Sequence, residues 1–219
     1  MREEVIERVS REKIIAIVRG VGSEQCMNVA NALYGGGVRL MEITYDQSRP
    51  ESWAATAEAI GDIARAFEGR MLVGAGTVTE TALVGLTRDA GGLFIISPDT
   101  NTDVIKRTRE LGLVSMPGAL TPSEIMTAHR AGADFVKLFP AADMGPGYLK
   151  AVRAPLNHIK LMAVGGINEK NAGDFLAAGA AGVGVGGNLA NRAWIEAGEF
   201  GKITAAASAL VSAVAAFKK

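Results

Sequence analysis

The fold is decided by a pattern that is plainest in residues 131–140, AGADFVKLFP. Gly132 is the kind of residue that ends a helix, and the run 134–138 after it has the length and composition of a buried strand. Pro140 closes the run. Lys137 lies inside it, where an ammonium group is costly to bury. The stretch therefore predicts a helix that turns at glycine into a strand carrying one buried amine.

This pattern repeats along the chain. Eight strand-like runs occur at 14–18, 38–44, 71–76, 93–97, 113–116, 134–138, 160–164 and 182–186. Segments with helical periodicity or helix-start residues separate and follow them, at 23–34, 50–67, 80–90, 102–111, 122–131, 147–153, 169–178 and about 203–217. Such alternation implies parallel strands joined by right-handed crossovers.

Eight strand–helix units predict an α/β fold, a (β/α)8 TIM barrel forming a single domain over residues 1–219. A helix over residues 2–11 is expected to close its lower end. The alternative is an open doubly wound sheet. Against it, the first strand leads into residues 19–22, RGVG, and not into a Gly-x-Gly-x-x-Gly turn.

Composition excludes several functional classes. The chain has 23 basic and 23 acidic residues and no basic run, so we expect neither a nucleic acid nor a membrane surface as partner. The single cysteine, Cys26, cannot form an internal disulfide and fits a reducing cytoplasm. The charged N-terminus does not resemble a signal peptide, and no apolar stretch is expected to approach membrane-spanning length.

In a TIM barrel the chemistry gathers where the strands end. The side chains expected at this mouth are Arg19, Glu42, Thr44, Thr77, Pro98, Lys137 and Phe139. Each has a structural alternative. Arg19 could be a surface cation, Glu42 a partner of Arg39 or Lys137, and Thr77 the N-cap of a helix with Glu80 completing a capping box.

Lys137 is the most informative of these residues. Burial disfavours the ammonium form and lowers the pKa of a lysine, which yields a nucleophilic amine at neutral pH. Such an amine can form a Schiff base with a carbonyl substrate. The alternative is a structural lysine that pairs with a carboxylate or extends to solvent at the end of the strand.

Two glycine turns follow the seventh and eighth strands. They contain Gly165 and Gly166 in the first case and Gly187 with Asn188 in the second. Loops at these places in a barrel commonly bind phosphate, because glycine permits close approach to backbone N–H groups. The alternative is that the glycines only terminate strands.

Seven motifs, in order over nearly the whole chain, carry a family resemblance. They are residues 15–20 (IAIVRG), 36–44 (GGVRLMEIT), 73–78 (VGAGTV), 96–98 (ISP), 116–118 (MPG), 136–141 (VKLFPA) and 165–167 (GGI). Together they resemble the class I 2-keto-3-deoxy-6-phosphogluconate / 4-hydroxy-2-oxoglutarate aldolases, a family that includes related 6-phosphogalactonate enzymes. The resemblance implies cleavage of a 2-keto-3-deoxy sugar acid, or of 4-hydroxy-2-oxoglutarate, to pyruvate and an aldehyde by a homotrimer.

The same resemblance implies roles for the mouth residues. Lys137 would form the Schiff base and Glu42 would act as general acid and base through a water. Thr77 would hold the pyruvate carboxylate, with Pro98 and Phe139 packed against the substrate. The glycine turns would bind a distal phosphate. We expect no cofactor and no metal, because the protonated imine supplies the polarisation that a Lewis acid would otherwise provide.

Three departures from the gluconate-type pattern leave the substrate open. Asp46 stands where many members have a carboxylate-binding arginine, so we expect Arg19 to supply the cation. Val164 stands where gluconate-type enzymes usually have threonine, as in galactonate-type enzymes, and Asn188 stands where serine is frequent.

Two other functional classes compete with an aldolase on such a fold. A phosphosugar isomerase or epimerase would use paired acids and bases without a lysine in a strand. A non-catalytic sugar-acid-binding protein would bind its ligand without imine chemistry.

Overall fold

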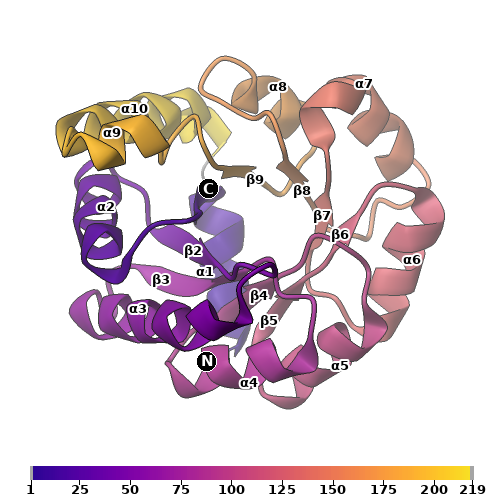
Figure 1. Ribbon diagram of the computed structural model, residues 1–219. Helices are drawn as coiled ribbons and strands as arrows, with labels where there is room; N and C mark the ends of the chain where they lie inside the picture. Colours follow the sequence, from indigo (N-terminus) through magenta and orange to yellow (C-terminus); the bar gives the residue numbers. More distant parts are fainter. Residues whose placement is uncertain (1, 218–219) are drawn as a thin grey trace.

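The computed structural model describes residues 2–217, which form one ring of parallel strands with helices around it (Figure 1). The strands are β1 (Ile14–Val18), β2 (Leu40–Thr44), β3 (Leu72–Gly76), β4 (Phe94–Ile96), β5 (Val114–Met116), β6 (Gly118–Ala119), β7 (Val136–Leu138), β8 (Leu161–Val164) and β9 (Gly182–Val185). Every strand pairing is parallel. The single-domain TIM-type barrel is confirmed.

The fifth expected strand, 113–116, is present as β5, and a second short strand, β6, follows it that was not expected. β5 pairs with β4 and β6 pairs with β7, so the sheet order runs β5-β4-β3-β2-β1-β9-β8-β7-β6. Pro117 lies between the two strands and has no N–H group for a ladder hydrogen bond. The chain itself therefore joins the two edges of the sheet.

The helices lie outside the strands, except α1, which lies behind the ring in Figure 1. They are α1 (Arg2–Glu12), α2 (Ser23–Gly35), α3 (Trp53–Ala66), α4 (Thr81–Asp89), α5 (Thr102–Glu110), α6 (Pro122–Ala131), α7 (Ala141–Arg153), α8 (Ala172–Ala177), α9 (Arg192–Glu196) and α10 (Phe200–Val214), with 3-10 turns η1 (Pro50–Ser52) and η2 (Ala215–Phe217).

The largest differences from the sequence expectation are in α7 and α9. α7 begins at Ala141 instead of 147 and continues through Gly145, whose φ of 77° kinks it just before Pro146. The short α9 was not expected, and its start is capped by Asn191, which accepts hydrogen bonds from the backbone N–H groups of Ala193 and Trp194.

The expectation about apolar length was wrong for the last helix. Residues Phe200–Phe217 form a helix of 18 residues with mean hydropathy 1.6, long and apolar enough to cross a membrane by length and composition alone. In this fold the helix packs along α2. Thr204 donates a hydrogen bond to the Ala32 carbonyl at 3.1 Å, and Ile203, Leu210 and Val214 are buried.

The barrel interior is a separate apolar cluster from the layer between strands and helices. It contains Val5 and Val9 of α1 together with Ile15, Leu40, Leu72, Phe94, Ile96, Val114, Met116, Phe135, Met162 and Val164. α1 is thus confirmed as the closure of the lower end, and an ion pair between Arg2 and Asp134 fastens it there. A Cβ at Gly74 would lie 2.4 Å from the Phe94 ring, so this glycine makes room for the aromatic side chain.

Candidate active site

Lys137 of β7 and Glu42 of β2 are the two acidic or basic residues that are buried as whole residues among residues 2–217, with exposures of 7 % and 1 %. Both line one narrow apolar cavity inside the barrel, together with Met116, Met162 and Val164. Because β2 and β7 are not neighbours in the sheet, the barrel closure is what brings the amine and the carboxyl together.

Burial moves both groups toward their neutral forms. It lowers the pKa of Lys137 from its ordinary value, against the opposing attraction of Glu42. It also raises the pKa of Glu42 to about 7, although the charges of Lys137 and Arg19 act in the other direction. A deprotonated amine is the nucleophile of imine chemistry, and a carboxyl group that titrates near neutrality can both accept and return a proton.

The Glu42 carboxylate has space and a free oxygen. A Cβ at Gly76 would lie 2.3 Å from Glu42 Oε1. The glycine at this position of β3 therefore leaves room for the Glu42 carboxylate. Within residues 2–217 no hydrogen-bond partner reaches Oε2. A buried oxygen of this kind is poised to bind a hydroxyl group or a water.

Phe139 and the first glycine turn border Lys137. Lys137 Nζ lies 4.8 Å from the Phe139 ring centroid, and the ring is 40 % exposed. A Cβ at Gly165 would come within 3.1 Å of the same ring. Pro98 follows β4, and its carbonyl oxygen would be 2.3 Å from a Cβ at Gly118, the residue of β6 that pairs with Lys137. Of the two apolar residues expected from sequence, Phe139 thus lies beside the amine and Pro98 packs on the neighbouring strand, while substrate contact by either stays a prediction.

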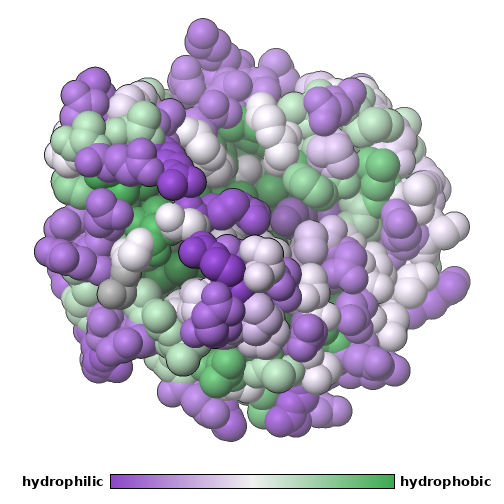
Figure 2. All heavy atoms as spheres, in the orientation of Figure 1, coloured by the Kyte–Doolittle hydropathy of each residue, from purple (hydrophilic) through white to green (hydrophobic). Residues whose placement is uncertain are grey.

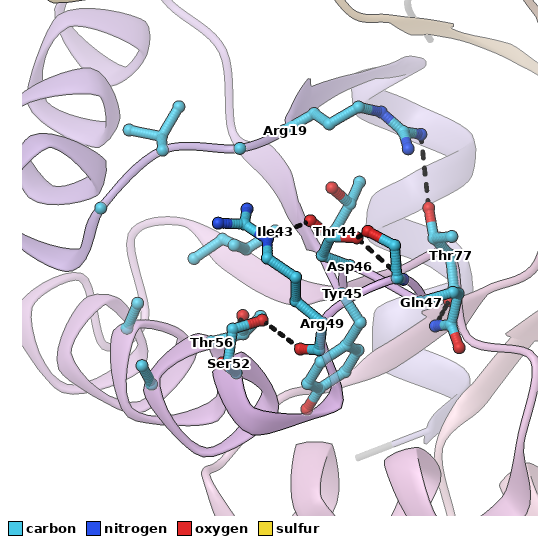
Figure 3. A pocket seen from close by; sticks show the side chains of 16 residues that line it. Arg19, Ile43, Thr44, Tyr45, Asp46, Gln47, Arg49, Ser52, Thr56 and Thr77 are labelled. Carbon is cyan, nitrogen blue, oxygen red and sulfur yellow. Dashed lines mark hydrogen bonds and ion pairs between the residues drawn. The ribbon is translucent and has the colours of Figure 1, made fainter.

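Arg19 and Thr77 meet above β2, as Figure 3 shows. Arg19 Nη2 lies 3.3 Å from Thr77 Oγ1, and Thr44 ends β2 beneath them with 6 % exposure. Thr77 does not cap α4, since that helix begins after Glu80 and has no side-chain cap. The capping interpretation was wrong because the chain turns at Thr77, with φ of 57°, before the helix starts.

Asp46 forms its side-chain hydrogen bonds within the loop after β2. It accepts hydrogen bonds from Ser48 and from Arg49 Nε, the latter at 2.8 Å, and these bonds lower its pKa to about 2. The carboxylate therefore stays charged and organises the loop after β2. Arg19, Asp46 and Arg49 line a cleft of about 570 Å³ whose floor includes Ala55 and Ala59 of α3. Figure 2 shows a green recess with a purple rim on this side of the mouth.

The two glycine turns lie together at the far side of the mouth. Gly165 and Gly166 have φ of 96° and 72°, which only glycine adopts without strain. Asn188 Nδ2 donates to the Ile167 carbonyl at 3.1 Å and so links the second turn to the first. Gly187 has open space where a Cβ would be. The turns are positioned as expected, while phosphate binding by them stays a prediction.

One residue at the mouth was missed by the sequence reasoning. Gln47 donates from Nε2 to the Thr77 carbonyl at 2.6 Å and accepts at Oε1 from Thr79 Oγ1 at 2.9 Å. A glutamine in a loop has no periodicity or motif that would single it out. Among residues 2–217 no group of three or more His, Cys, Asp or Glu side chains could hold a metal ion.

Comparison of the sequence with known proteins points to one family. The family model for KDPG and KHG aldolases matches residues 5–206. The chain is 37% identical over 177 residues to a probable 2-dehydro-3-deoxy-6-phosphogalactonate aldolase of Rhizobium meliloti, and the matched region covers 80% of this chain and 81% of that protein. It is 34% identical over 177 residues to the 2-dehydro-3-deoxy-6-phosphogalactonate aldolase of Escherichia coli, covering 80% and 83%.

A solved structure shows the same architecture with a captured ligand. The KDPG aldolase of Legionella pneumophila, which holds pyruvate as a covalent carbinolamine intermediate, superimposes with a TM-score of 0.84 at 25% identity. The match covers 96% of this chain and 98% of that one.

Proposed function

The chain belongs to the KDPG and KHG aldolase family, and from that premise we propose that it cleaves 2-keto-3-deoxy-6-phosphogalactonate to pyruvate and glyceraldehyde 3-phosphate. The aldolase activity is that of the family. The observation that carries the mechanism is the buried pair Lys137 and Glu42 in one cavity. The choice of the galactonate substrate is supported by the names of two relatives and by Val164 before the first glycine turn.

The proposed reaction begins when neutral Lys137 attacks the C2 ketone. Loss of water from the resulting carbinolamine gives a protonated imine, which accepts the electron pair of the C3–C4 bond as that bond breaks. Glu42 takes the proton of the C4 hydroxyl, so the aldehyde forms and an enamine remains on Lys137. Protonation of the enamine at C3 and hydrolysis of the imine release pyruvate and restore the amine.

The ends of the substrate would be held by residues already described. Arg19 and Thr77 form the polar side of the mouth and fit the C1 carboxylate. A planar guanidinium suits the bidentate binding of such a group. The turns at Gly165 and Gly187 fit the distal phosphate, while Phe139 and Pro98 enclose the carbons between the two ends.

Assembly and compartment remain proposals. The family resemblance supports a homotrimer, and the single cysteine, Cys26, supports a reducing cytoplasm. Sedimentation at several protein concentrations would test the trimer.

The substrate proposal is tested with the two epimers at C4. Steady-state cleavage of the 6-phosphogalactonate and 6-phosphogluconate forms is followed by coupled detection of pyruvate. We expect kcat/KM to favour the galactonate form by at least about tenfold, which is 1.4 kcal/mol of transition-state discrimination. A preference for the gluconate form would overturn the galactonate choice and leave the aldolase mechanism in place.

A second prediction concerns Arg19. Arg19→Met should weaken the apparent affinity for pyruvate and for the aldol substrate about ten- to a hundredfold, because a hydrogen bond to a charged group contributes roughly 1.5–3 kcal/mol. Steady-state kinetics and pyruvate titration measure this change. Unchanged affinity would mean that Arg19 is a surface cation and that Thr77 and backbone N–H groups hold the carboxylate alone.

A further inference from the structure

We infer that Gln47 is a positioning residue which fixes Thr77 in its left-handed conformation and thereby orients the pocket for the substrate carboxylate. This inference rests on the proposed function, in which Thr77 binds that carboxylate. Gln47 itself lies in the loop after β2 and makes no contact with Lys137 or Glu42 among its hydrogen bonds.

The conformation of Thr77 is the first observation. Its φ of 57° is unusual for a β-branched residue, because the branched side chain crowds the backbone there. Such a residue persists only where its surroundings hold it, and residues of this kind cluster at ligand sites. Among the residues described, Thr77 and Lys13 are the only non-glycine residues with a positive φ.

The hydrogen bonds around the turn show what holds it. Before Thr77, the Gly76 carbonyl accepts from Tyr45 N–H at 3.0 Å, and after it, Val78 N–H donates to the Ile96 carbonyl at 3.2 Å. These bonds fix the flanking residues to the sheet. The Thr77 carbonyl, in contrast, is bound by the Gln47 side chain at 2.6 Å.

The Gln47 amide is itself fixed at both ends. Its oxygen accepts from Thr79 Oγ1, so the donor Nε2 is directed at Thr77 and the amide spans the turn from 77 to 79. Figure 3 shows Gln47 beneath Thr77, on the side away from Arg19. Loss of the amide would let the turn relax toward negative φ and carry Thr77 Oγ1 away from Arg19.

The effect should fall on carboxylate binding and not on the reacting groups. We therefore expect Gln47→Met, which keeps the length of the side chain and removes both hydrogen bonds, to raise the pyruvate concentration for half-maximal borohydride trapping at Lys137. Two neutral hydrogen bonds correspond to a rise of about tenfold. The amount trapped at saturating pyruvate should equal that of the unsubstituted protein.

A double-substitution cycle distinguishes positioning from a general structural role. In Thr77→Gly the turn adopts a positive φ without strain and has no hydroxyl group to orient. Adding Gln47→Met to this variant should change the half-maximal pyruvate concentration by less than about twofold, because residues that act through one another are not additive. A full additional tenfold rise would overturn the inference.

Matched variants complete the experiment. Thr56 lines the same cleft, and its hydroxyl donates to the Ser52 carbonyl just before its own helix, so Thr56→Val should leave trapping unchanged. Thr79→Val removes only the bond that fixes the Gln47 oxygen and should raise the half-maximal concentration about two- to threefold. Thr79→Val serves as the test if Gln47→Met does not fold. In that case an unchanged half-maximal pyruvate concentration in Thr79→Val would overturn the inference. Absence of trapping in the unsubstituted protein would instead refute the proposed function.

Discussion

Lys137→Met should abolish covalent capture of pyruvate and lower aldol cleavage by at least about 10³-fold, as expected when a covalently acting group is removed. The amine is 7 % exposed on β7, and burial lowers its pKa, so it can attack a ketone at neutral pH. Methionine fills similar space in an apolar cavity without a nucleophile. The barrel should therefore still fold.

Borohydride reduction with pyruvate, followed by peptide mass mapping, measures the first effect. In the unsubstituted protein the reduced pyruvyl group should appear at Lys137 alone in stoichiometric amount. Lys160→Met is the control, because Lys160 lies just before β8 and is exposed. Stoichiometric labelling of Lys160 or Lys150, or labelling that survives in Lys137→Met, would exclude the assigned nucleophile.

Glu42→Gln should keep imine formation and lose about 10²–10⁴-fold in turnover, the usual contribution of general acid–base catalysis. Glutamine fits the space that Gly76 leaves for the carboxylate, but it cannot exchange the proton of the C4 hydroxyl. Single-turnover kinetics measure the loss, and pyruvate trapping is the internal control. Near-normal turnover would show that Glu42 is only a structural partner of Lys137.

The pH dependence offers an independent check of the same residue. Since burial raises the Glu42 pKa to about 7, the rate of cleavage should rise with pH through neutrality as the carboxylate forms. Glu42→Gln should lose this limb. A limb near pH 7 that persists in the variant would belong to another group.

The contribution of Glu42 to folding stability should fall with rising pH, whereas the cleavage rate should rise. The folded pKa of about 7 lies above the ordinary value of 4.5, so between these pH values the folded state binds more protons than the unfolded state. The contribution of Glu42 to stability therefore falls as pH rises through this window and stays low above it. Glu42→Gln should be more stable than the parent at pH 8, by on the order of 3 kcal/mol, with the difference vanishing near pH 4. Urea unfolding at the two pH values measures this.

The parts of the site that were predictable share one property. Lys137 and Glu42 stand out because each is an ionisable residue within an apolar strand. Parallel strands also place their carboxyl ends at the same end of the barrel. That argument needs only periodicity and chain topology. Pro117 explains why the ladder is interrupted, but the pairing of β6 with β7 depends on how the two edges of the sheet meet, which no local pattern encodes.

The turn at Thr77 was misread for a related reason. Residues 77–80 have the composition of a capping box, and only tertiary contacts decide against it. The Gln47 amide and the pairing of residues 76 and 78 with neighbouring segments hold the chain in a left-handed turn, so α4 begins later. Contacts between residues distant in sequence thus determined what the sequence pattern could not.

The position of helix α1 limits access to Lys137 to one end of the barrel, and this bears on the order in which the products would leave. Val5 and Val9 close the lower end of the barrel, so Lys137 is reached from the mouth. In the proposed reaction the aldehyde would then lie between the enamine and solvent after bond cleavage, and it would depart before pyruvate. The water that hydrolyses the imine enters along the path the aldehyde has vacated. The proposed mechanism therefore predicts one order of release, with aldehyde first and pyruvate last, and in the synthetic direction it predicts that pyruvate binds first.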